Sequence, residues 1–509
     1  MNKFFLALLS VFSPLMSFAN EATNQGLDNQ INEVFAKYTG WFVNAIFYQI
    51  PISEDAGIPW VVILLLGFAT FFTIYFKFIN LGAFTTAINV VRGKYDAIDD
   101  HSNQEDVNVL EVDHDIKGTI KDESQEGEVS HFQALTAALS GTVGLGNIAG
   151  VAIAITIGGP GATFWMIVAG LLGMTSKFAE CTLGVKYRDI GEDGTVYGGP
   201  MYYLKKGLTE KGYAGFGKIL AVLFAIFCIG GSFGGGNMFQ SNQAAQIFND
   251  IIGNESSSGG FYFGLVMAVF VGVVIIGGVK RIASVTEKIV PFMVGIYLLA
   301  AFVVIGMNIS QVGSAFVSIF DGAFSPSGVT GGIIGVLIQG FRRAAFSNEA
   351  GVGSAAIAHS AVKTKFAASE GIVALLEPFI DTVVVCTITA LVIVITGNYL
   401  DPGAASGVEL TSNAFASAIP WFPYVLTVAV VLFAFSTMIS WSYYGLQSWL
   451  FLFGKTKRNT ITYKVVFCIF TIIGASISLG AVTDFSDAMI FAMSVPNLIG
   501  VSLLLPKIK

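Results

Sequence analysis

Two stretches of the 509-residue chain combine glycine with hydrogen-bonding side chains in strongly apolar surroundings. They are Ser140 to Asn147 (SGTVGLGN) and Phe346 to Gly353 (FSNEAGVG). Glycine in an apolar helix commonly serves close packing, so a single such stretch would be weak evidence for an interrupted helix. An interruption frees backbone N–H groups, which can bind a carboxylate, and carbonyl oxygens, which can bind a metal cation or an ammonium group. The pair of stretches therefore predicts a site for a small zwitterion next to a cation.

The elements that must hold these stretches are membrane-spanning helices. Of all residues, 54% are hydrophobic and only 12% are Asp, Glu, Lys or Arg, whereas soluble proteins carry about 25% charged residues. The apolar residues fall in blocks of roughly 20, which match the hydrocarbon thickness of a bilayer. We expect an all-α membrane protein with about eleven transmembrane helices. The blocks are 59–79, 132–158, 161–187, 217–248, 260–279, 284–308, 330–362, 366–397, 424–453, 462–480 and 484–506.

The positions of the two interruptions favour an inverted repeat. With 59–79 set aside as one extra N-terminal helix, the remaining blocks divide into two sets of about five, 132–308 and 330–506. Each set opens with an interrupted helix, and an odd number of spans gives the sets opposite orientations in the membrane. Non-helical backbone at that depth is tolerated only where it is buried in protein or lines a cavity. We therefore expect the two interruptions to meet near the middle of the membrane.

The chain ends and the loop charges predict an orientation. Residues 1–19 have the pattern of a cleavable signal peptide, with an uncleaved anchor as the alternative, and 20–58 would then be extracytoplasmic. Loops such as 309–329 and 398–423 contain no Lys or Arg, whereas the alternate loops are basic. The positive-inside rule places the N-terminus outside and the C-terminus in the cytoplasm. The acidic insertion 95–130 then lies on the cytoplasmic side and is too charged to be buried.

Several function classes are disfavoured by composition. A net charge of −7 without a basic stripe argues against nucleic-acid binding, and no ATP-binding loop of the GxxxxGK[ST] type is present, which favours an ion gradient as driving force. A channel and a membrane-embedded enzyme are the alternatives, but of four histidines only His359 lies clearly inside a block. No organic cofactor is expected, and nothing indicates an oligomeric state. The cysteines show no paired spacing and are expected to be buried hydrophobes: Cys181, Cys228, Cys386 and Cys468.

Longer strings of the chain carry a family resemblance. FQALTAALSGTVGLGNIAGVAIAITIGGPGATFWM (132–166), GMTSKFAECTLGVKYR (173–188), YGGPMYY (197–203), AFSNEAGVGSAAIAH (345–359) and SWSYYG (440–445) resemble the alanine or glycine:cation symporters, bacterial sodium-coupled carriers of small amino acids. The likeness runs from Trp60 to the C-terminus, and it departs at the acidic insertion and the signal-like N-terminus. It implies the helix arrangement of the leucine transporter, sodium or less often proton coupling, and alanine or glycine as substrate in the bacterial inner membrane.

A second likeness implies roles for individual residues. The string VGLGN (143–147) is similar to the first broken helix of the neurotransmitter:sodium symporters. It implies that the N–H groups of Leu145 and Gly146 hold the substrate carboxylate and that carbonyls near Thr142 and Phe346 hold the amine. It also implies two sodium sites, one from Asn147 and Ser347 and a second from the carbonyls of Ser140 and Val143 with the hydroxyls of Ser436 and Thr437. Serine and threonine also join membrane helices, which is the alternative for the last pair.

Three further polar or bulky residues are candidates for the substrate site. Trp441 lies about one turn after Thr437 and far from the membrane interfaces, so its indole would leave room only for a hydrogen or a methyl group. Ordinary packing is the alternative. Asn237 and Gln240 are three residues apart and share a helix face, where they either bind substrate or join helices.

Charged residues inside the apolar blocks are costly and are functional candidates. Arg342 and Arg343 precede the second interruption, Glu349 lies within it, and Asp381 lies on the following helix one turn after Glu377. We expect some of these to pair as gates, with fixed structural pairing as the alternative. Similar candidates are Lys177, Glu180 and His359, the last as a proton relay or a packed histidine.

Overall fold

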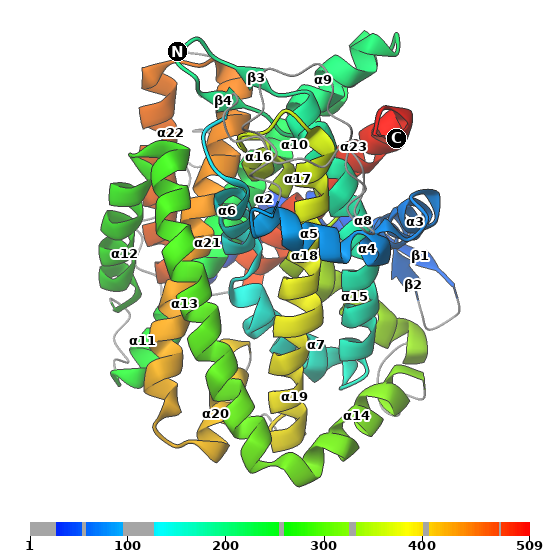
Figure 1. Cartoon of the computed structure of the whole chain (residues 1–509). Coiled ribbons are helices and arrows are strands. Elements are labelled where there is room, and N and C mark those ends of the chain that lie inside the picture. Colours follow the sequence, from blue (N-terminus) through cyan, green and yellow to red (C-terminus); the bar gives the residue numbers. More distant parts are fainter. Residues whose placement is uncertain are drawn as a thin grey trace.

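The computed structural model describes residues 27–52, 57–94, 127–253, 259–324, 332–400, 407–477 and 480–508, and nearly all of this part is helical (Figure 1). The predicted signal peptide 1–19 and most of the insertion 95–130 lie outside the described residues. The strands form two antiparallel hairpins, β1 (Gln49–Pro51) with β2 (Gly57–Pro59) and β3 (Asp189–Ile190) with β4 (Val196–Tyr197). The helical elements are α2 (Leu27–Ile46), α3 (Trp60–Tyr75), α4 (Ile79–Gly82), α5 (Phe84–Val91), α6 (His131–Thr142), η3 (Leu145–Asn147), α7 (Ala149–Gly158), α8 (Ala162–Lys186), α9 (Pro200–Glu210), α10 (Ala214–Phe233), η4 (Gly234–Met238), α11 (Phe239–Ile251), α12 (Gly259–Ile275), α13 (Gly278–Met307), α14 (Ile309–Phe324), α15 (Gly332–Asn348), α16 (Ala355–His359), α17 (Ala367–Ala374), α18 (Leu376–Pro378), η5 (Phe379–Cys386), α19 (Thr387–Thr396), α20 (Val408–Ala418), α21 (Phe422–Phe453), α22 (Lys457–Ser476), α23 (Gly480–Leu504) and η6 (Leu505–Lys507).

Within the described residues, 7 continuous helices are long and apolar enough to cross a membrane, or up to 8 with the bent pair α6 and η3–α7. The continuous ones are Ala162–Lys186, Ala214–Ile251, Gly278–Met307, Ala367–Thr396, Phe422–Phe453, Lys457–Ser476 and Thr483–Lys507. The expected larger number is not reached by this criterion, because α3 and α12 have only 16 and 17 residues and the second interrupted helix is split. The protein is therefore a mostly helical membrane protein with seven or eight candidate spans.

Several helices occupy segments where the sequence predicted connections. The clearest is α14, which replaces most of the expected loop 309–329. Its buried residues Ala315, Ile319 and Ala323 recur every four positions and so form one face, which packs against α8 and α19. A helix of 16 residues is shorter than the roughly 20 apolar residues typical of a span, so its sequence does not have the pattern of a membrane-spanning block. The other helices in segments where the sequence predicted no span are α2, with 20 residues, and the shorter α9 and α20.

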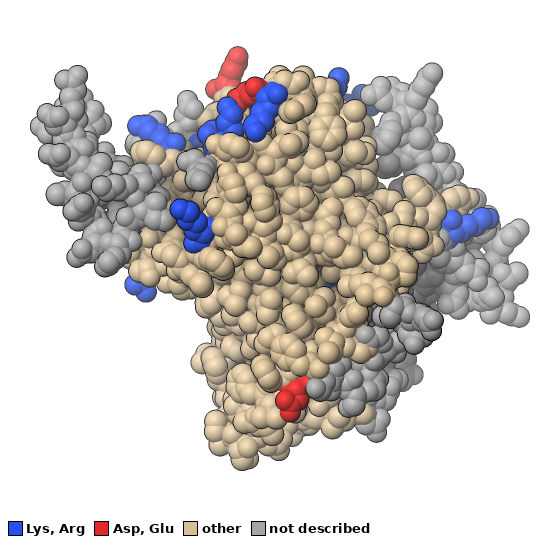
Figure 2. All heavy atoms as spheres, turned by 90° about the vertical axis from the view of Figure 1, so that its right-hand side faces the viewer, with Lys and Arg blue, Asp and Glu red and all other residues tan. Residues whose placement is uncertain are grey.

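The two ends of the molecule differ in charge. The hairpin β3–β4, α9 and the C-terminus lie at one end, and α14 and α20 lie at the other (Figure 1). On the face shown in Figure 2, lysine and arginine side chains lie over the half of the molecule toward the first of these ends, together with acidic ones, and the opposite end shows an acidic side chain and no basic one. This distribution agrees with the predicted asymmetry of the loops. The orientation itself stays a prediction.

Candidate functional site

The first predicted interruption is present and lies wholly inside the protein. The helix α6 ends at Thr142, the single turn η3 follows at Leu145, and α7 starts at Ala149, with a bend of 55° between the two halves. Gly141 and Thr142 still belong to α6, so the non-helical backbone begins slightly later than expected. Residues 140–150 are all buried. Backbone groups of this break are therefore screened from both lipid and bulk water.

The second interruption begins later than the sequence predicted. Residues 346–348 still belong to α15, and the non-helical segment runs from Glu349 to Ser354. Glu349 has φ 55°, and Gly351 and Gly353 have φ 84° and 94°. These left-handed conformations end the helix, and a non-glycine residue adopts one only where its surroundings hold it there. Glu349 is held on both sides, because Oε1 accepts a hydrogen bond from Trp441 Nε1 at 2.9 Å and Oε2 accepts one from Ser354 Oγ.

The two interrupted helices touch. A Cβ atom added at Gly146 would lie 3.3 Å from the Cα and Oγ atoms of Ser347, so glycine is needed for this close approach. Asn147 and Ser347 are expected to share a cation site, and at this contact Asn147 belongs to the first interrupted helix and Ser347 to the second. Both are almost completely buried.

A carboxylate joins Asn147 and Ser347. Asp381 Oδ1 accepts a hydrogen bond from Asn147 Nδ2 at 2.6 Å, and Oδ2 accepts bonds from Ser347 Oγ at 3.0 Å and Thr382 Oγ1 at 2.7 Å. The Asp381 side chain is 0% exposed, and the groups that hydrogen-bond to it among the described residues are neutral donors. A buried ionised carboxylate without a positive partner is costly. Asp381 thus belongs to the candidate cation site, and the expectation that it forms a gate with another charged residue has no support here.

Asp381 owes its position to a π-helical segment. It lies in η5, and Asn147 Nδ2 also donates to the Asp381 backbone carbonyl at 3.1 Å. π-helical turns change the register of a helix and often occur at functional sites. Cys386, at the end of η5, is buried as expected and lies 3.3 Å from Asn147 Nδ2, so its thiol is next to the candidate cation site.

A second π-helical segment, η4, contains the candidate Asn237 and leads into α11, which carries the candidate Gln240. Gln240 Oε1 accepts a hydrogen bond from the Leu145 N–H at 3.3 Å, which is one of the groups expected to bind the substrate carboxylate. Gln240 is therefore brought to the first break. Asn237 is not, because its side chain donates to the Phe467 carbonyl at 2.7 Å and accepts from Thr471 Oγ1 at 2.8 Å. Of the two interpretations for Asn237, the structure supports the joining of helices.

The expected second cation site brings α6 and α21 together. Ser140 Oγ donates to the Ser436 carbonyl at 2.6 Å, and the Ser436 hydroxyl donates to Phe433 on its own helix at 2.9 Å. Thr437 Oγ1 is buried without a hydrogen-bond partner among the described residues. A Cβ atom at Gly144 would lie only 2.4 Å from it. An unsatisfied oxygen therefore faces the non-helical backbone next to Val143.

The remaining substrate candidates enclose the breaks. Trp441 is 1% exposed, and its indole lies against Gly236, where a Cβ atom would meet the ring at 2.3 Å. Phe346 is packed edge-on against Phe239, with ring centroids 5.5 Å apart. The Thr142 hydroxyl bonds within its own helix, to the Ala138 carbonyl at 3.3 Å. Aromatic rings on α15 and α21 are thus packed in the protein interior near the two breaks.

Both arginines before the second break pair with the last helix. Arg342 Nη2 and Arg343 Nη2 lie 2.8 Å and 2.6 Å from Asp487 Oδ2 on α23. Asp487 and Arg343 are buried, whereas Arg342 is 23% exposed and its guanidinium lies 4.4 Å from the centre of the Phe47 ring. Within the described residues, neither arginine pairs with Glu349 or Asp381. The expected charge pairing exists, but its partner is Asp487.

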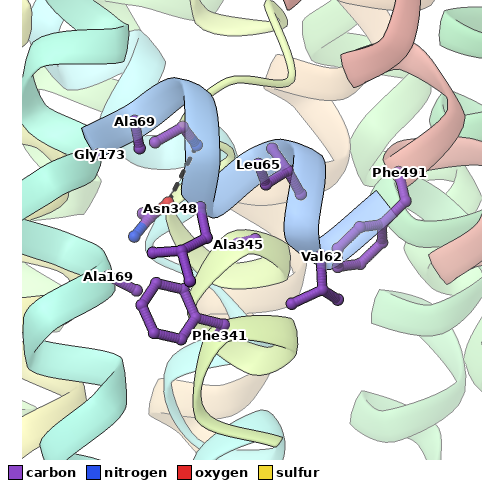
Figure 3. A pocket seen from close by; sticks show the side chains of 11 residues that line it. Val62, Leu65, Ala69, Ala169, Gly173, Phe341, Ala345, Asn348 and Phe491 are labelled. Carbon is purple, nitrogen blue, oxygen red and sulfur yellow. Dashed lines mark hydrogen bonds between the residues drawn. The ribbon is translucent and has the colours of Figure 1, made fainter. Parts of the chain in front are cut away.

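A narrow apolar cavity lies on another side of the second break (Figure 3). Leu65 and Ala69 of α3 face Phe341 and Asn348 of α15 across it. Its volume of ≈ 20 Å³ is about what one water molecule requires, so it cannot hold an amino acid. A Cβ atom at Gly351 would lie 2.8 Å from Leu65 Cδ2. The extra helix α3 therefore packs directly on the second break.

Sequence reasoning missed three charged or titratable residues: His131, Glu370 and Asp487. Glu370 and Asp487 lie inside the predicted blocks 366–397 and 484–506, where every charge is a candidate. His131 precedes the block 132–158 by one residue. The position of a charge in or beside an apolar block was therefore visible in the sequence. The side chains with which these residues pair lie on other helices and are visible only in the structure.

Comparison with known proteins identifies the fold family. The sequence pattern of the sodium:alanine symporter family matches residues 48–509. The chain belongs to the sodium:alanine symporter family. This confirms the resemblance seen in the sequence and makes the protein a membrane transporter rather than an enzyme.

Relatives of this symporter cover most of its length. The sodium/alanine symporter AgcS of Methanococcus maripaludis is 40% identical over 449 residues, which is 88% of this chain and 92% of AgcS. The probable sodium/glutamine symporter GlnT of Bacillus subtilis is 33% identical over 87% of this chain and 85% of GlnT. Among solved structures, MhsT in complex with L-phenylalanine has a TM-score of 0.55 at 17% identity, over 75% of this chain and 90% of MhsT. At that identity the likeness shows only the fold, which is that of the leucine transporter.

Proposed function

We propose that this symporter imports small amino acids, such as alanine and glycine, together with sodium by alternating access across the bacterial inner membrane. The single observation that carries the proposal is the contact between the two helix breaks beside Asp381, a buried carboxylate whose described hydrogen-bond donors are all neutral. The proposal includes two inverted sets of about five spans, preceded by α3 as an extra helix. It also includes the outside N-terminus and the cytoplasmic C-terminus.

Sodium is the missing positive partner in this proposal. Asp381 and the Ser347 hydroxyl supply the charge and hard oxygen atoms that a small cation prefers. The Asn147 amide, whose Nδ2 donates to Asp381 while Oδ1 accepts from the Gly144 N–H, would have to turn to offer its oxygen to the ion. A second sodium ion would bind the carbonyls of Ser140 and Val143 with the hydroxyls of Ser436 and Thr437. The unsatisfied Thr437 oxygen supports this second site. No organic cofactor takes part.

The amino acid would lie between the two breaks. The N–H groups of Leu145 and Gly146 would bind its carboxylate, in place of the Gln240 oxygen that now accepts from Leu145. Carbonyls near Thr142 and Phe346 would bind its ammonium group. Trp441 limits the side chain to a hydrogen or a methyl group, which agrees with the alanine named for AgcS. The glutamine named for GlnT requires more room, and it is a property of that relative.

Purified protein in liposomes tests the function. An inward sodium gradient should drive accumulation of labelled alanine or glycine, and an equal potassium gradient should not. Excess unlabelled leucine should compete poorly, because Trp441 closes the site. Uptake driven by a proton gradient in the absence of sodium would favour the proton-coupled alternative. Currents that never saturate with substrate would favour a channel.

The Arg342, Arg343 and Asp487 cluster is proposed as the gate on the extracytoplasmic side of the second break. Asp487→Asn leaves the buried Arg343 without its counter-charge, which should lower sodium-driven uptake by about 100-fold, since an unpaired buried charge costs about 3–5 kcal/mol. Asp484→Asn is the matched control, because Asp484 is 64% exposed and lies 4.0 Å from Arg342. Its uptake should change less than about twofold.

The double variant Arg343→Gln/Asp487→Asn separates a gate from a fixed structural pair. The double variant should be well folded by size-exclusion chromatography, because it buries no unpaired charge at these two positions. A gate predicts that the double variant still exchanges amino acid but accumulates little against a gradient. Full recovery of accumulation would contradict the gate and show that the pair is only structural.

A further inference from the structure

A chain of buried ionisable side chains connects the two interrupted helices at the end opposite to Asp487. Glu370 on α17 bridges two histidines, with Oε2 on His131 Nδ1 and Oε1 on His359 Nδ1 at 2.5 Å. His131 is the first residue of α6, and His359 is the last residue of α16. All three side chains are 0% exposed. One carboxylate therefore holds the start of the first interrupted helix to the end of the second.

Further charges face this bridge from the packed helices. His359 Nε2 lies 3.6 Å from Glu377 Oε2, and the same oxygen lies 3.4 Å from Lys177 Nζ on α8. Glu180 of α8 accepts from Asn497 Nδ2 at 2.6 Å, and that amide also donates to the Gly351 carbonyl in the second break at 2.9 Å. The charged network thus reaches from the histidine bridge to the non-helical backbone of the site.

Backbone hydrogen bonds reinforce the same junction. Glu128 N–H donates to the Ala361 carbonyl at 2.8 Å, and Lys363 N–H donates to the Val129 carbonyl at 2.8 Å. Arg188 Nη1 donates to the Ser360 carbonyl at 2.9 Å. The segments just before α6 and just after α16 are therefore tied together. If the halves of the broken helices separate, the histidine bridge is the charged contact that has to break.

We propose that Glu370 is a positioning residue that locks the proposed cytoplasmic side of the transport site by bridging His131 and His359. The lock rests on the proposed alternating-access function. It holds α6 and α16 together while the breaks are closed to the cytoplasm, and its rupture lets both halves separate. An ionised Glu370 only accepts hydrogen bonds, so both Nδ1 atoms donate to it and the carboxylate charge strengthens both arms.

Cys386 offers a native reporter of this opening. It is buried next to Asn147 and Ser347, so a reagent reaches it only when a path to the cation site is open. The parent protein for these experiments has Cys181, Cys228 and Cys468 replaced by serine, so that Cys386 is its single cysteine. A membrane-impermeant thiol reagent is applied to inside-out and to right-side-out vesicles, and the rate of labelling is measured from each side.

Glu370→Gln should raise the Cys386 labelling rate by about tenfold in inside-out vesicles, because a neutral amide weakens both arms of the bridge. The rate in right-side-out vesicles should stay unchanged. The matched control is Glu287→Gln, because Glu287 accepts from Gln133 Nε2 on α6 at 2.9 Å but ties α6 to α13 and not to α16. This control should leave both rates unchanged.

Histidine variants separate the lock from a general loss of packing. His359→Ala should raise labelling from the cytoplasmic side as Glu370→Gln does, whereas His359→Asn should stay near the parent rate, because its amide can donate in place of Nδ1. These variants decide the question if Glu370→Gln does not fold. Equal inside-out rates in the parent and the folded variants, or a rise from both sides, would overturn the lock. Absence of sodium-driven uptake in the parent would refute the transport function, which labelling does not measure.

Discussion

Asp381→Asn should abolish sodium-driven uptake. Asp381 is the one carboxylate that contacts both Asn147 and Ser347 within the described part of the chain, and the groups that hydrogen-bond to it there are neutral donors. A sodium ion next to Asp381 would pair with the buried carboxylate, which otherwise has no counter-ion in contact. Loss of one partner of a buried ion pair costs about 3–5 kcal/mol. At about 1.4 kcal/mol per factor of ten, sodium affinity should fall by roughly 100-fold or more.

Thermal unfolding gives an independent readout of the same variant. Sodium that binds only the folded protein raises the melting temperature of the parent in a concentration-dependent way. The Asp381→Asn protein should lose this sodium-dependent rise. Without sodium it should be at least as stable as the parent, because an amide accepts hydrogen bonds without burying a net charge.

Asp321→Asn is the control for loss of an acidic side chain. Asp321 is exposed on α14, away from both breaks. Its uptake and its sodium-dependent melting should match those of the parent. An Asp381→Asn protein that keeps both properties would show that the cation binds elsewhere.

Glycine spacing predicts the interrupted helices well, but it does not predict where each interruption starts. The first break lies close to its expected place because Gly144 and Gly146 are both needed for close approach, to Thr437 and to Ser347. The second starts at Glu349, later than expected, because a left-handed glutamate ends α15. Its conformation depends on Trp441 and Ser354, and such tertiary support is not visible in composition.

The sequence indicates which buried charged residues are candidates for function, but it does not predict which residues they contact. Rules for charges in membranes singled out Arg343 and Asp381, yet Arg343 pairs with Asp487 on the last helix and Asp381 binds neutral groups. These contacts join helices far apart in the chain, which local spacing does not specify. The π-helical segments were also unforeseen, although the run Gly234–Gly236 in η4 is a signal for altered helical geometry.

Gly144→Ala should reduce sodium-driven uptake by about 10- to 100-fold. A methyl group at this position would lie 2.4 Å from Thr437 Oγ1 and 3.4 Å from Gln240 Oε1, so the threonine would have to rotate or the break would have to move. Overpacking of this kind costs about 1–3 kcal/mol. Gly150→Ala is the matched control, because Gly150 is buried on α7 and a Cβ atom there would meet nothing within 4 Å. Its uptake should stay within about twofold of the parent.

The double variant Gly144→Ala/Thr437→Ala separates the steric effect from the loss of a sodium ligand. Removal of the threonine hydroxyl relieves the contact, so folding and size-exclusion behaviour should return to those of the parent. If Thr437 is a ligand, the sodium concentration for half-maximal uptake should remain raised, by the same factor as in Thr437→Ala alone. Recovery of the parent's sodium dependence in the double variant would show that the buried hydroxyl only packs against the break. The second sodium site would then have to be placed elsewhere along α6 and α21.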